Sequence, residues 1–359
     1  MLLGGASNLR AGLTFNFTEG TELAALATSD PTLHSQVIGG FNAAGLIWQN
    51  LFYDDVVINV TINYAPLGPG VLGSTGSTEY VGSYDEIRNA LLFDAQTVGD
   101  VVSSTSLPNG LSLSIRTNDR SGASVLDNDG SANNSNIVIT GANAKALNLI
   151  TPGDSFYDLE DATLTFSSLF DFDFDRSDGI SGSEYDFIGT AAHEIGHALG
   201  FISGVDVVDF LSGAGPGASN DLNDGDPGIG TLDDYAVFKV LDLFRNTSLA
   251  ESGGYDYDWT TGGSPMFTID GGATLLLPFS NGSFNGSDLR QASHWKDNLG
   301  IGIMDPTLGL GEQIDPTLFD MTAFDVIGWD LHAVPEPGSL TLCSLAAAGW
   351  YGARRRRRT

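Results

Sequence analysis

The chain has 359 residues, of which 45 are acidic and only 15 are basic. Five of the basic residues form the run from Arg354 to Arg358, so the rest of the chain carries 10 basic side chains against 45 acidic ones. A surface this negative argues against binding to nucleic acid or to an anionic membrane surface, and it suits a secreted protein that can bind Ca²⁺. The only cysteine, Cys343, excludes a disulfide within the chain.

The first half of the chain alternates strand-like and helix-like patterns. Asp30 and Pro31 are typical of a helix start, and apolar residues such as Phe41 and Trp48 follow at helical spacing. The expected order is a strand at 13–18, a helix at 30–51, a strand at 56–64, a loop at 66–82, a partly helical segment at 84–102, strands at 111–115 and 137–139, a short helix at 142–149 and a strand at 162–166. This order predicts an α+β fold in which a twisted mixed sheet packs on two long helices.

The second long helix is expected at 185–200, and it carries a metal-binding pattern. His193 and His197 lie one turn apart and face away from the apolar stripe of the helix. At this spacing both imidazoles can reach one zinc ion. Glu194, next to His193, is placed where a carboxylate can reach a water on that ion and act as a general base.

The ends of this helix also have sequence signals. Ser181 and Glu184 are spaced as a capping box at its start. Gly200 is placed to end the helix and turn the chain.

Two acidic runs flank the helix in sequence. The carboxylates of Asp171 to Asp175 alternate along a segment that could hold Ca²⁺ or form a solvated acidic turn, and Arg176 stands where an EF-hand loop requires glycine. The run from Asn220 to Asp226 leaves the same two alternatives open. Ca²⁺ is therefore a candidate second metal, and a solvated acidic turn is the favoured interpretation of both runs.

The region after the helix is irregular. Residues 204–290 are rich in Gly, Asp and Ser, with one helical piece around 235–244, and are expected to form a lobe beside a cleft. Residues 315–327 predict a closing helix with one apolar side formed by Leu318, Met321 and Phe324.

A catalytic zinc site needs a third protein ligand. The compact pattern His-Glu-x-x-His-x-x-Gly-x-x-His would place a histidine at position 203, where the chain has Ser203, a poor zinc ligand. Asp206 and Asp209 lie just past the helix and remain open as acidic third ligands. Glu184 lies too far towards the helix start to act as the third ligand of the same zinc ion.

The other histidines are distant in sequence. His34 lies near a helix start far upstream, and His332 lies beside the C-terminal tail. His294 remains, and it is followed ten residues later by Met304 in a Gly-Ile-Met-Asp-Pro turn.

These features together resemble leishmanolysin-like metzincins, and more closely a bacterial group of metzincin-like metalloproteases that end in a PEP-CTERM tail. The similar segments are 186–206, 241–245, 269–272, 292–306 and 324–329. The resemblance implies that His294 is a displaced third zinc ligand after an insertion, and that Met304 packs under the site without binding zinc. It also implies a catalytic subdomain at 1–203, an insertion and irregular C-terminal subdomain at 204–333, and a sorting tail at 334–359.

The tail has three parts. Pro335-Glu336-Pro337 precedes an apolar stretch at 340–353, which is shorter than the ~20 residues of a full membrane span, and the arginine run ends the chain. The arrangement resembles a PEP-CTERM sorting signal, which implies transient insertion in the inner membrane, recognition by an exosortase, and a secreted or surface-held product. The segment Met1 to Ala6 is too short for a complete signal peptide, so an export signal is expected outside it.

The predicted function is a zinc-dependent endopeptidase that cleaves extracellular proteins or peptides, with Glu194 as the general base and His193, His197 and His294 as zinc ligands. The family resemblance implies that substrate lies extended along the exposed edge of the strand at 162–167. Two alternatives remain. One is a catalytically inactive, metal-binding surface or matrix protein that keeps the fold. The other is a gluzincin-type site with an acidic third ligand.

Overall fold

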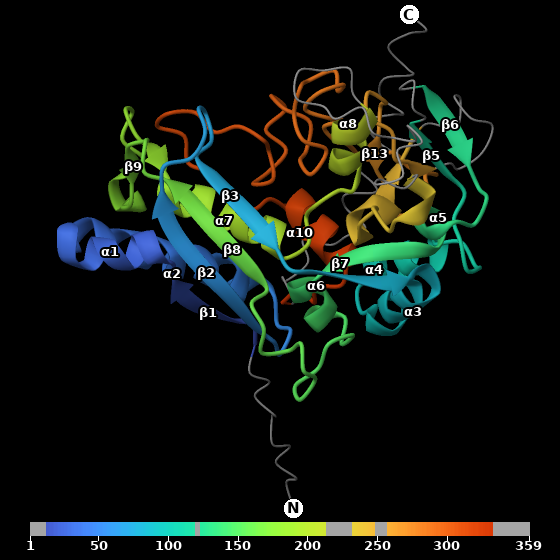
Figure 1. The fold of residues 1–359 in the computed structure, drawn as a ribbon, viewed down its shortest axis with the longest axis horizontal. Coiled ribbons are helices and arrows are strands. Elements are labelled where there is room, and N and C mark those ends of the chain that lie inside the picture. The colour runs from blue at the N-terminus through green and yellow to red at the C-terminus, as the bar shows by residue number, and fades with distance from the viewer. Residues whose placement is uncertain (1–11, 119–122, 213–231, 248–256, 333–359) are drawn as a thin grey trace, which may run out of the picture.

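The computed structural model describes residues 12–118, 123–212, 232–247 and 257–332. Over these residues the chain mixes helices with several sheets, as the α+β prediction requires (Figure 1). The helices are α1 Thr21–Ser29, α2 Pro31–Leu51, α3 Tyr84–Asp94, α4 Val98–Ser106, α5 Ala132–Ser135, α6 Gly141–Ala146, α7 Phe187–Ala198, α8 Val205–Ser212 and α10 Leu318–Val326. The strands are β1 Thr14–Glu19, β2 Val57–Ala65, β3 Gly73–Ser77, β4 Glu79–Ser83, β5 Ile115–Asn118, β6 Ser124–Asp127, β7 Asn136–Thr140, β8 Ala162–Ser167, β9 Phe172–Asp173, β10 Tyr185–Asp186, β11 Arg245–Asn246, β12 Tyr257–Asp258, β13 Met266–Phe267 and β14 Leu277–Pro278.

The sheet that supports the site has the order β1-β2-β8-β3. β1, β2 and β8 run parallel, and β3 runs antiparallel to β8. In β2, alternate residues such as Ile58, Val60 and Ile62 are buried, which is why the period-2 pattern is visible in the sequence. Helices α2 and α7 lie against one face of this sheet (Figure 1).

Aromatic side chains join the two long helices to the sheet. The Asp30 carboxylate caps α2 by accepting a hydrogen bond from the Leu33 backbone N–H, as the Asp-Pro start predicts. Further along α2, the ring of Phe41 lies 5.1 Å from Phe166 of β8 and 5.5 Å from Phe187 at the start of α7. These fully buried rings fix α7 on the sheet.

The prediction of a loop at 66–82 is wrong. This stretch contains β3 and most of β4, which pair with β8 and β7. Since β8 is therefore paired on both sides, with β2 and with β3, the expectation that its edge is free for substrate is also wrong. The edge strands of this sheet are β1 and β3, and β3 is the one next to β8. Residues Gly73 to Ser77 have short side chains without an apolar–polar alternation, so the sequence does not predict this strand. The strand forms because its main chain pairs with β8.

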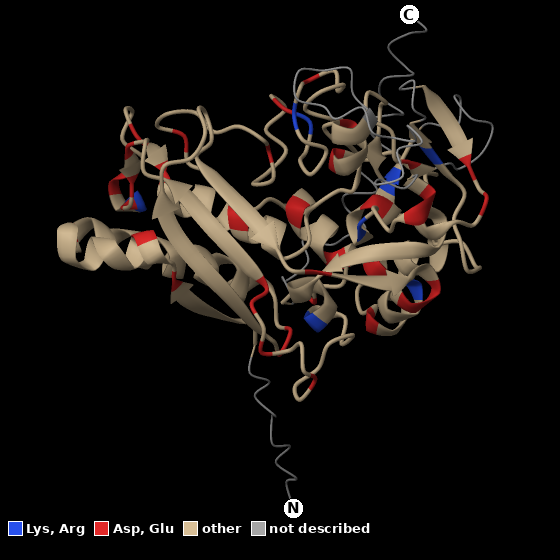
Figure 2. Ribbon diagram, in the orientation of Figure 1, with Lys and Arg blue, Asp and Glu red and all other residues tan. Residues whose placement is uncertain are grey.

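The second half of the described chain is mostly irregular. Its strands β11 to β14 are two residues long and join β5 and β6 in a six-stranded sheet with the order β14-β13-β11-β12-β5-β6. Helix α10 buries Ala323 and Phe324, whereas Leu318 is exposed, so the predicted apolar side is only partly correct. Acidic side chains occur on helices such as α3, α8 and α10 and in many loops, whereas strands β2, β3 and β8 carry none; basic side chains are few (Figure 2).

Carboxylates cluster where α4 meets the end of α10. The members are Asp54, Asp94, Asp100, Asp325 and Asp330. Burial, reinforced by neighbouring carboxylates, raises the pKa of Asp94 to about 8 and the pKa of Asp325 to about 7. Burial likewise raises the pKa of Asp100 to about 6. These groups bind protons more tightly in the folded chain than in the unfolded chain, where an aspartate has a pKa of about 3.9.

Because of this cluster, the free energy of unfolding contributed by these groups is expected to fall as the pH rises from about 4 to about 8. Asp94→Asn removes one of the charges that develop over this range. The variant should therefore melt at a higher temperature than the wild type at pH 8, and the gain should vanish near pH 4. Thermal melts over this pH range test the expectation, with the exposed residue Asp158 replaced by asparagine as the control. An equal gain at both pH values would contradict it.

Candidate metal centre

Helix α7 begins one residue after a buried cap. The Asp186 carboxylate accepts a hydrogen bond from the Gly189 backbone N–H at 3.0 Å and forms an ion pair with Arg176. The predicted capping box of Ser181 and Glu184 is therefore wrong, since these residues form a turn before the helix. Asp186 caps the helix because its carboxylate is fixed by Arg176 from outside the helix.

The other end of α7 is closed by Gly200, as predicted. Gly200 has a φ of 115°, and the backbone N–H groups of Gly200 and Phe201 donate to the carbonyls of His197 and Gly196. This turn brings the Phe201 carbonyl back to His197, whose Nδ1 lies 2.7 Å from it. The helix end therefore also orients a histidine.

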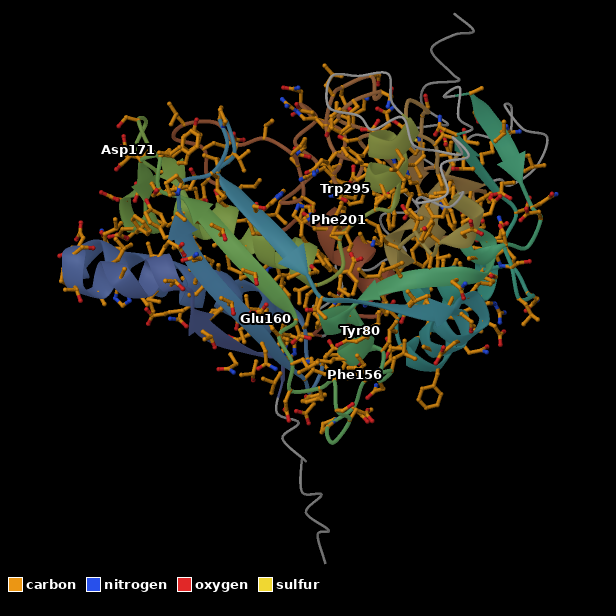
Figure 3. All side chains as sticks on the ribbon, in the orientation of Figure 1. Tyr80, Phe156, Glu160, Asp171, Phe201 and Trp295 are labelled. Carbon is orange, nitrogen blue, oxygen red and sulfur yellow. The ribbon has the colours of Figure 1, made fainter. Side chains whose placement is uncertain are left out.

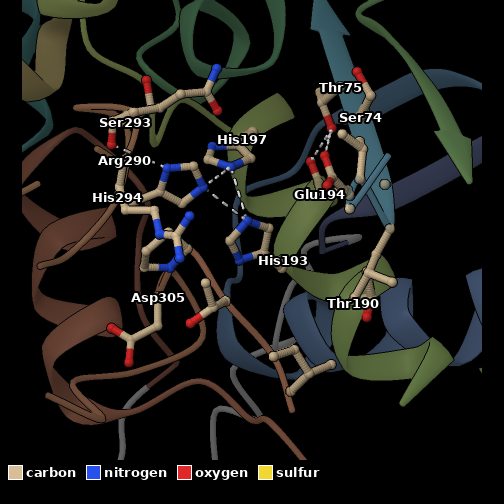
Figure 4. A pocket seen from close by; sticks show the side chains of 18 of the residues that line it. Ser74, Thr75, Thr190, His193, Glu194, His197, Arg290, Ser293, His294 and Asp305 are labelled. Carbon is tan, nitrogen blue, oxygen red and sulfur yellow. Dashed lines mark hydrogen bonds between the residues drawn. The ribbon is translucent and has the colours of Figure 1, made fainter. Parts of the chain in front are cut away.

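The structure brings His193, His197 and His294 together (Figure 4). Their Nε2 atoms lie 3.1 Å apart for His193 and His197, 3.2 Å for His197 and His294, and 3.3 Å for His193 and His294. A tetrahedral zinc centre with Zn–N bonds of about 2.0–2.1 Å separates its nitrogen ligands by about 3.3–3.4 Å. The three imidazoles therefore already have nearly the spacing that one zinc ion requires.

The outer nitrogen of each ring faces a backbone carbonyl. The Nδ1 atoms of the triad lie 2.6 Å from the Ile303 oxygen, 2.7 Å from the Phe201 oxygen and 3.3 Å from the Gln291 oxygen. A carbonyl can only accept a hydrogen bond, so Nδ1 carries the proton and the unprotonated Nε2 lone pairs face one another. Three converging lone pairs suit a cation, so the residues present fit zinc.

Burial keeps two of these rings neutral. It lowers the pKa of His197 to about 3 and, together with the neighbouring imidazoles, holds the pKa of His294 well below its usual range. A neutral imidazole is the form that binds a metal ion.

Glu194 lies beside the triad and contacts strand β3 (Figure 4). The Thr75 hydroxyl donates to its carboxylate at 2.6 Å, and the same hydroxyl lies 2.9 Å from the Glu194 backbone oxygen. Burial raises the pKa of the carboxyl group. Gly73 of the same strand leaves room for this side chain, because a Cβ at position 73 would lie 2.7 Å from Glu194 Oε1.

These groups open on a cleft of about 660 Å³. One wall is formed by residues 70–75, which include the first half of β3, and another by residues 289–291, 293–294 and 305–308. Among the described residues that line the cleft, Arg290 is the only lysine or arginine. Its Nε donates to Asp297 at 2.9 Å.

Met304 packs against Gly196 of α7, the residue immediately before His197. A Cβ added at Gly196 would lie 2.6 Å from the Met304 sulfur, which shows how close the two segments are. The fully buried Asp320 carboxylate accepts hydrogen bonds from the Ile303 and Met304 backbone N–H groups and from the Trp295 indole. Asp320 therefore holds the methionine turn, and the sequence pattern gave no indication of that role.

The aromatic ring of Trp295 packs next to the C-terminal end of α7. Its centroid lies 5.0 Å from that of Phe201, and Figure 3 shows the two side chains together at the centre of the molecule. The Trp329 indole donates to the Leu199 carbonyl at 2.8 Å. The segments after His294 and after α10 are thus both fixed to the end of α7.

The two acidic alternatives to His294 lie elsewhere. The Asp206 carboxylate accepts hydrogen bonds from the Ala292 and Ser293 backbone N–H groups. The Asp209 carboxylate accepts hydrogen bonds from the Thr261 hydroxyl and from the backbone N–H groups of Phe284 and Asn285. Neither is grouped with the histidine triad.

The remaining candidates are also outside the triad. His34 lies 2.8 Å from a Glu19 carboxylate oxygen, and the His332 ring lies near Tyr53. The Ser203 hydroxyl donates to Asp242.

The Asp171–Asp175 run does not bring three carboxylates together. Asp173 and Asp175 accept hydrogen bonds from nearby backbone N–H groups, and Asp171 lies near the edge of the molecule, away from the central Trp295 (Figure 3). Within the described ranges, the second group besides the histidine triad whose side chains are close enough to share one metal ion is formed by Asp127, Asp129 and Asp233. Ca²⁺ remains a prediction. The run at 220–226, the segment 1–6 and the tail lie outside the described residues.

Comparison with known families gives one match, the PEP-CTERM protein-sorting motif, at residues 333–357. This motif marks proteins that an exosortase recognises and that are exported to the cell surface or the extracellular space. The chain is therefore exported, as predicted. No curated protein and no solved structure matches it. No helix in the described ranges is both long and apolar enough to cross a bilayer.

Proposed function

We propose that the protein is a zinc-dependent endopeptidase with a metzincin-like catalytic domain. The observation that carries this proposal is the convergence of three Nε2 atoms within 3.1–3.3 Å of one another, beside the buried carboxylate of Glu194. The order of the groups along the chain also supports it, because Gly200 ends the helix and Met304 packs against Gly196, next to His197. Export through the PEP-CTERM motif suits an enzyme that acts on extracellular protein.

In the proposed mechanism the three histidines bind the metal and Glu194 transfers the proton. His193, His197 and His294 would hold the metal through Nε2, with Nδ1 fixed by backbone carbonyls. When bound, zinc polarises a carbonyl group and lowers the pKa of a water molecule towards ~7. The Glu194 carboxylate accepts a proton from the attacking water and passes it to the leaving amine. The Thr75 hydroxyl holds this carboxylate in place.

The edge strand β3 is the proposed support for the substrate. Gly73, Ser74 and Thr75 line the cleft, and the outer edge of β3 has no partner among the described strands. An extended peptide can add to such an edge through main-chain hydrogen bonds. A peptide bound in this way would have its scissile bond near Glu194, since Thr75 of β3 contacts that residue.

Reconstitution with zinc tests the proposed function. We expect the full chain to bind one zinc per molecule and to cleave casein, to lose activity on treatment with a chelator, and to regain it when zinc is added. Zinc content by elemental analysis and casein digestion are the measurements. A chain that binds zinc but cleaves no protein or peptide would instead favour the inactive surface-protein alternative.

Gly73→Ala is expected to lower kcat while zinc content stays unchanged. The new methyl group would lie 2.7 Å from Glu194 Oε1, so the carboxylate must move, and misplacing a catalytic group by about 1 Å can cost about 100-fold in rate. We expect a loss of about 10- to 100-fold. Gly76→Ala is the matched control, because it lies in the same strand and its Cβ would meet nothing within 4 Å. Equal activities of the two variants would contradict the assigned position of Glu194.

A further inference from the structure

The main chain that carries His294 is held by a carboxylate from the segment after the zinc helix. Asp206, at the start of α8, accepts hydrogen bonds from the Ala292 backbone N–H and, at 3.1 Å, from the Ser293 backbone N–H. The Ser293 hydroxyl donates to the same carboxylate. Asp206 therefore binds the two residues immediately before the third histidine, and its carboxylate oxygens are engaged with them.

Ser203 adds a second contact to the same segment. Its backbone N–H donates to the Ser293 hydroxyl oxygen at 2.8 Å, and its own hydroxyl donates to the fully buried Asp242. Position 203 is where the compact pattern would carry its third histidine. In this chain the same position anchors the loop that brings His294 from elsewhere.

A buried arginine completes the arrangement from the other side. The Arg245 guanidinium is 1 % exposed and donates to the Ala292 carbonyl at 3.1 Å and to the Ser280 carbonyl at 2.7 Å. The Ser280 backbone N–H donates to the His294 carbonyl at 3.0 Å. The backbone at Ala292 is thus bound at its N–H by an anion and at its carbonyl by a cation, which are stronger contacts than neutral hydrogen bonds.

We infer that Asp206 is a positioning residue for the third metal ligand. By fixing the backbone at Ala292 and Ser293 with a charged acceptor, it sets the direction in which the His294 imidazole points. The inference rests on the proposed function, and it gives Asp206 a role other than that of an acidic ligand. Residues that orient a ligand in this way usually contribute about 10- to 100-fold to metal affinity.

The test is Asp206→Asn in the full chain, with zinc affinity as the first readout. The amide keeps the shape of the side chain but places an NH₂ group against one of the N–H donors. We expect the zinc dissociation constant to rise about 10- to 100-fold, peptide hydrolysis to recover at high zinc, and the visible spectrum of the Co²⁺-substituted protein to change. A loss of stability alone would not alter the spectrum of the folded protein.

Asp209→Asn is the matched control. Asp209 lies in the same helix, is 1 % exposed, and also accepts hydrogen bonds from two successive backbone N–H groups, those of Phe284 and Asn285. We expect this variant to be destabilised but to keep its zinc affinity and Co²⁺ spectrum. Ser293→Ala, which removes only the hydroxyl bridge, is a milder second variant and should weaken zinc binding less than Asp206→Asn does.

Unchanged zinc affinity and an unchanged Co²⁺ spectrum in both Asp206→Asn and Ser293→Ala would overturn the inference. Equal loss of zinc affinity in Asp209→Asn would also overturn it, because the effect would then be general destabilisation. A wild-type chain that binds no zinc would instead refute the proposed function. The two failures are therefore distinguishable.

Discussion

Glu194→Gln is expected to lower kcat/KM for peptide hydrolysis by about 10²- to 10⁴-fold while zinc remains bound. Glutamine has nearly the same shape as glutamate, so the contact with Thr75 can be kept, but the amide cannot accept a proton from water. Glu194 is not a member of the close metal-ligand group formed by the three histidines, which is why metal content should not change. Kinetics on a quenched fluorescent peptide, together with zinc analysis of the same samples, provide the measurement.

Glu184→Gln is the control for this experiment. The substitution is chemically identical and lies only a few residues before α7, but Glu184 does not line the cleft beside the histidine triad. Substitutions at such positions usually change energies by no more than about 0.5 kcal/mol. Near-normal turnover by Glu194→Gln would exclude Glu194 as the general base.

His294→Ala is expected to remove both zinc binding and activity. The remaining Nε2 atoms of His193 and His197 provide only two protein ligands, and a catalytic zinc site needs three. Removing a ligand should cost more affinity than disturbing a residue that only orients one, so we expect the dissociation constant to rise more than ~100-fold. Zinc titration with a competing chelator measures this directly, and added zinc should not restore hydrolysis.

His34→Ala provides the comparison, since His34 lies against Glu19 at the surface. Its zinc affinity and activity should equal those of the wild type. If His294→Ala keeps its zinc and its activity, the third ligand is another residue, and the acidic alternatives Asp206 and Asp209 become the candidates again.

Strong periodicity made much of the N-terminal fold predictable. Helix α2 and strand β2 each bury one side of a long, regular pattern, and both lie close to their predicted positions. Strand β3 and helices α1 and α8 were not predicted. β3 has no buried residue of its own and exists because its main chain pairs with β8. Such a strand depends on the neighbour that it pairs with, which a local pattern does not contain.

The candidate site also has one part that the local sequence pattern predicts and another part that it does not. His193, Glu194 and His197 are close in sequence, so the period of one helix is sufficient to place them together. The position of His294 instead depends on contacts that have no sequence period, those of Asp206, Arg245 and Ser280. For this reason the residue type and the resemblance to a family suggested His294, whereas the side chains that hold it became visible only in the fold.

The separation of the third histidine from the first two affects when the site can exist. Synthesis proceeds from the N-terminus, so a nascent chain that ends before residue 294 has the proposed base and two imidazoles but not the third. The sorting motif at 333–357 is made later still. If the triad holds zinc as proposed, the displaced ligand delays hydrolytic activity until His294 and the segment that carries it have been synthesised.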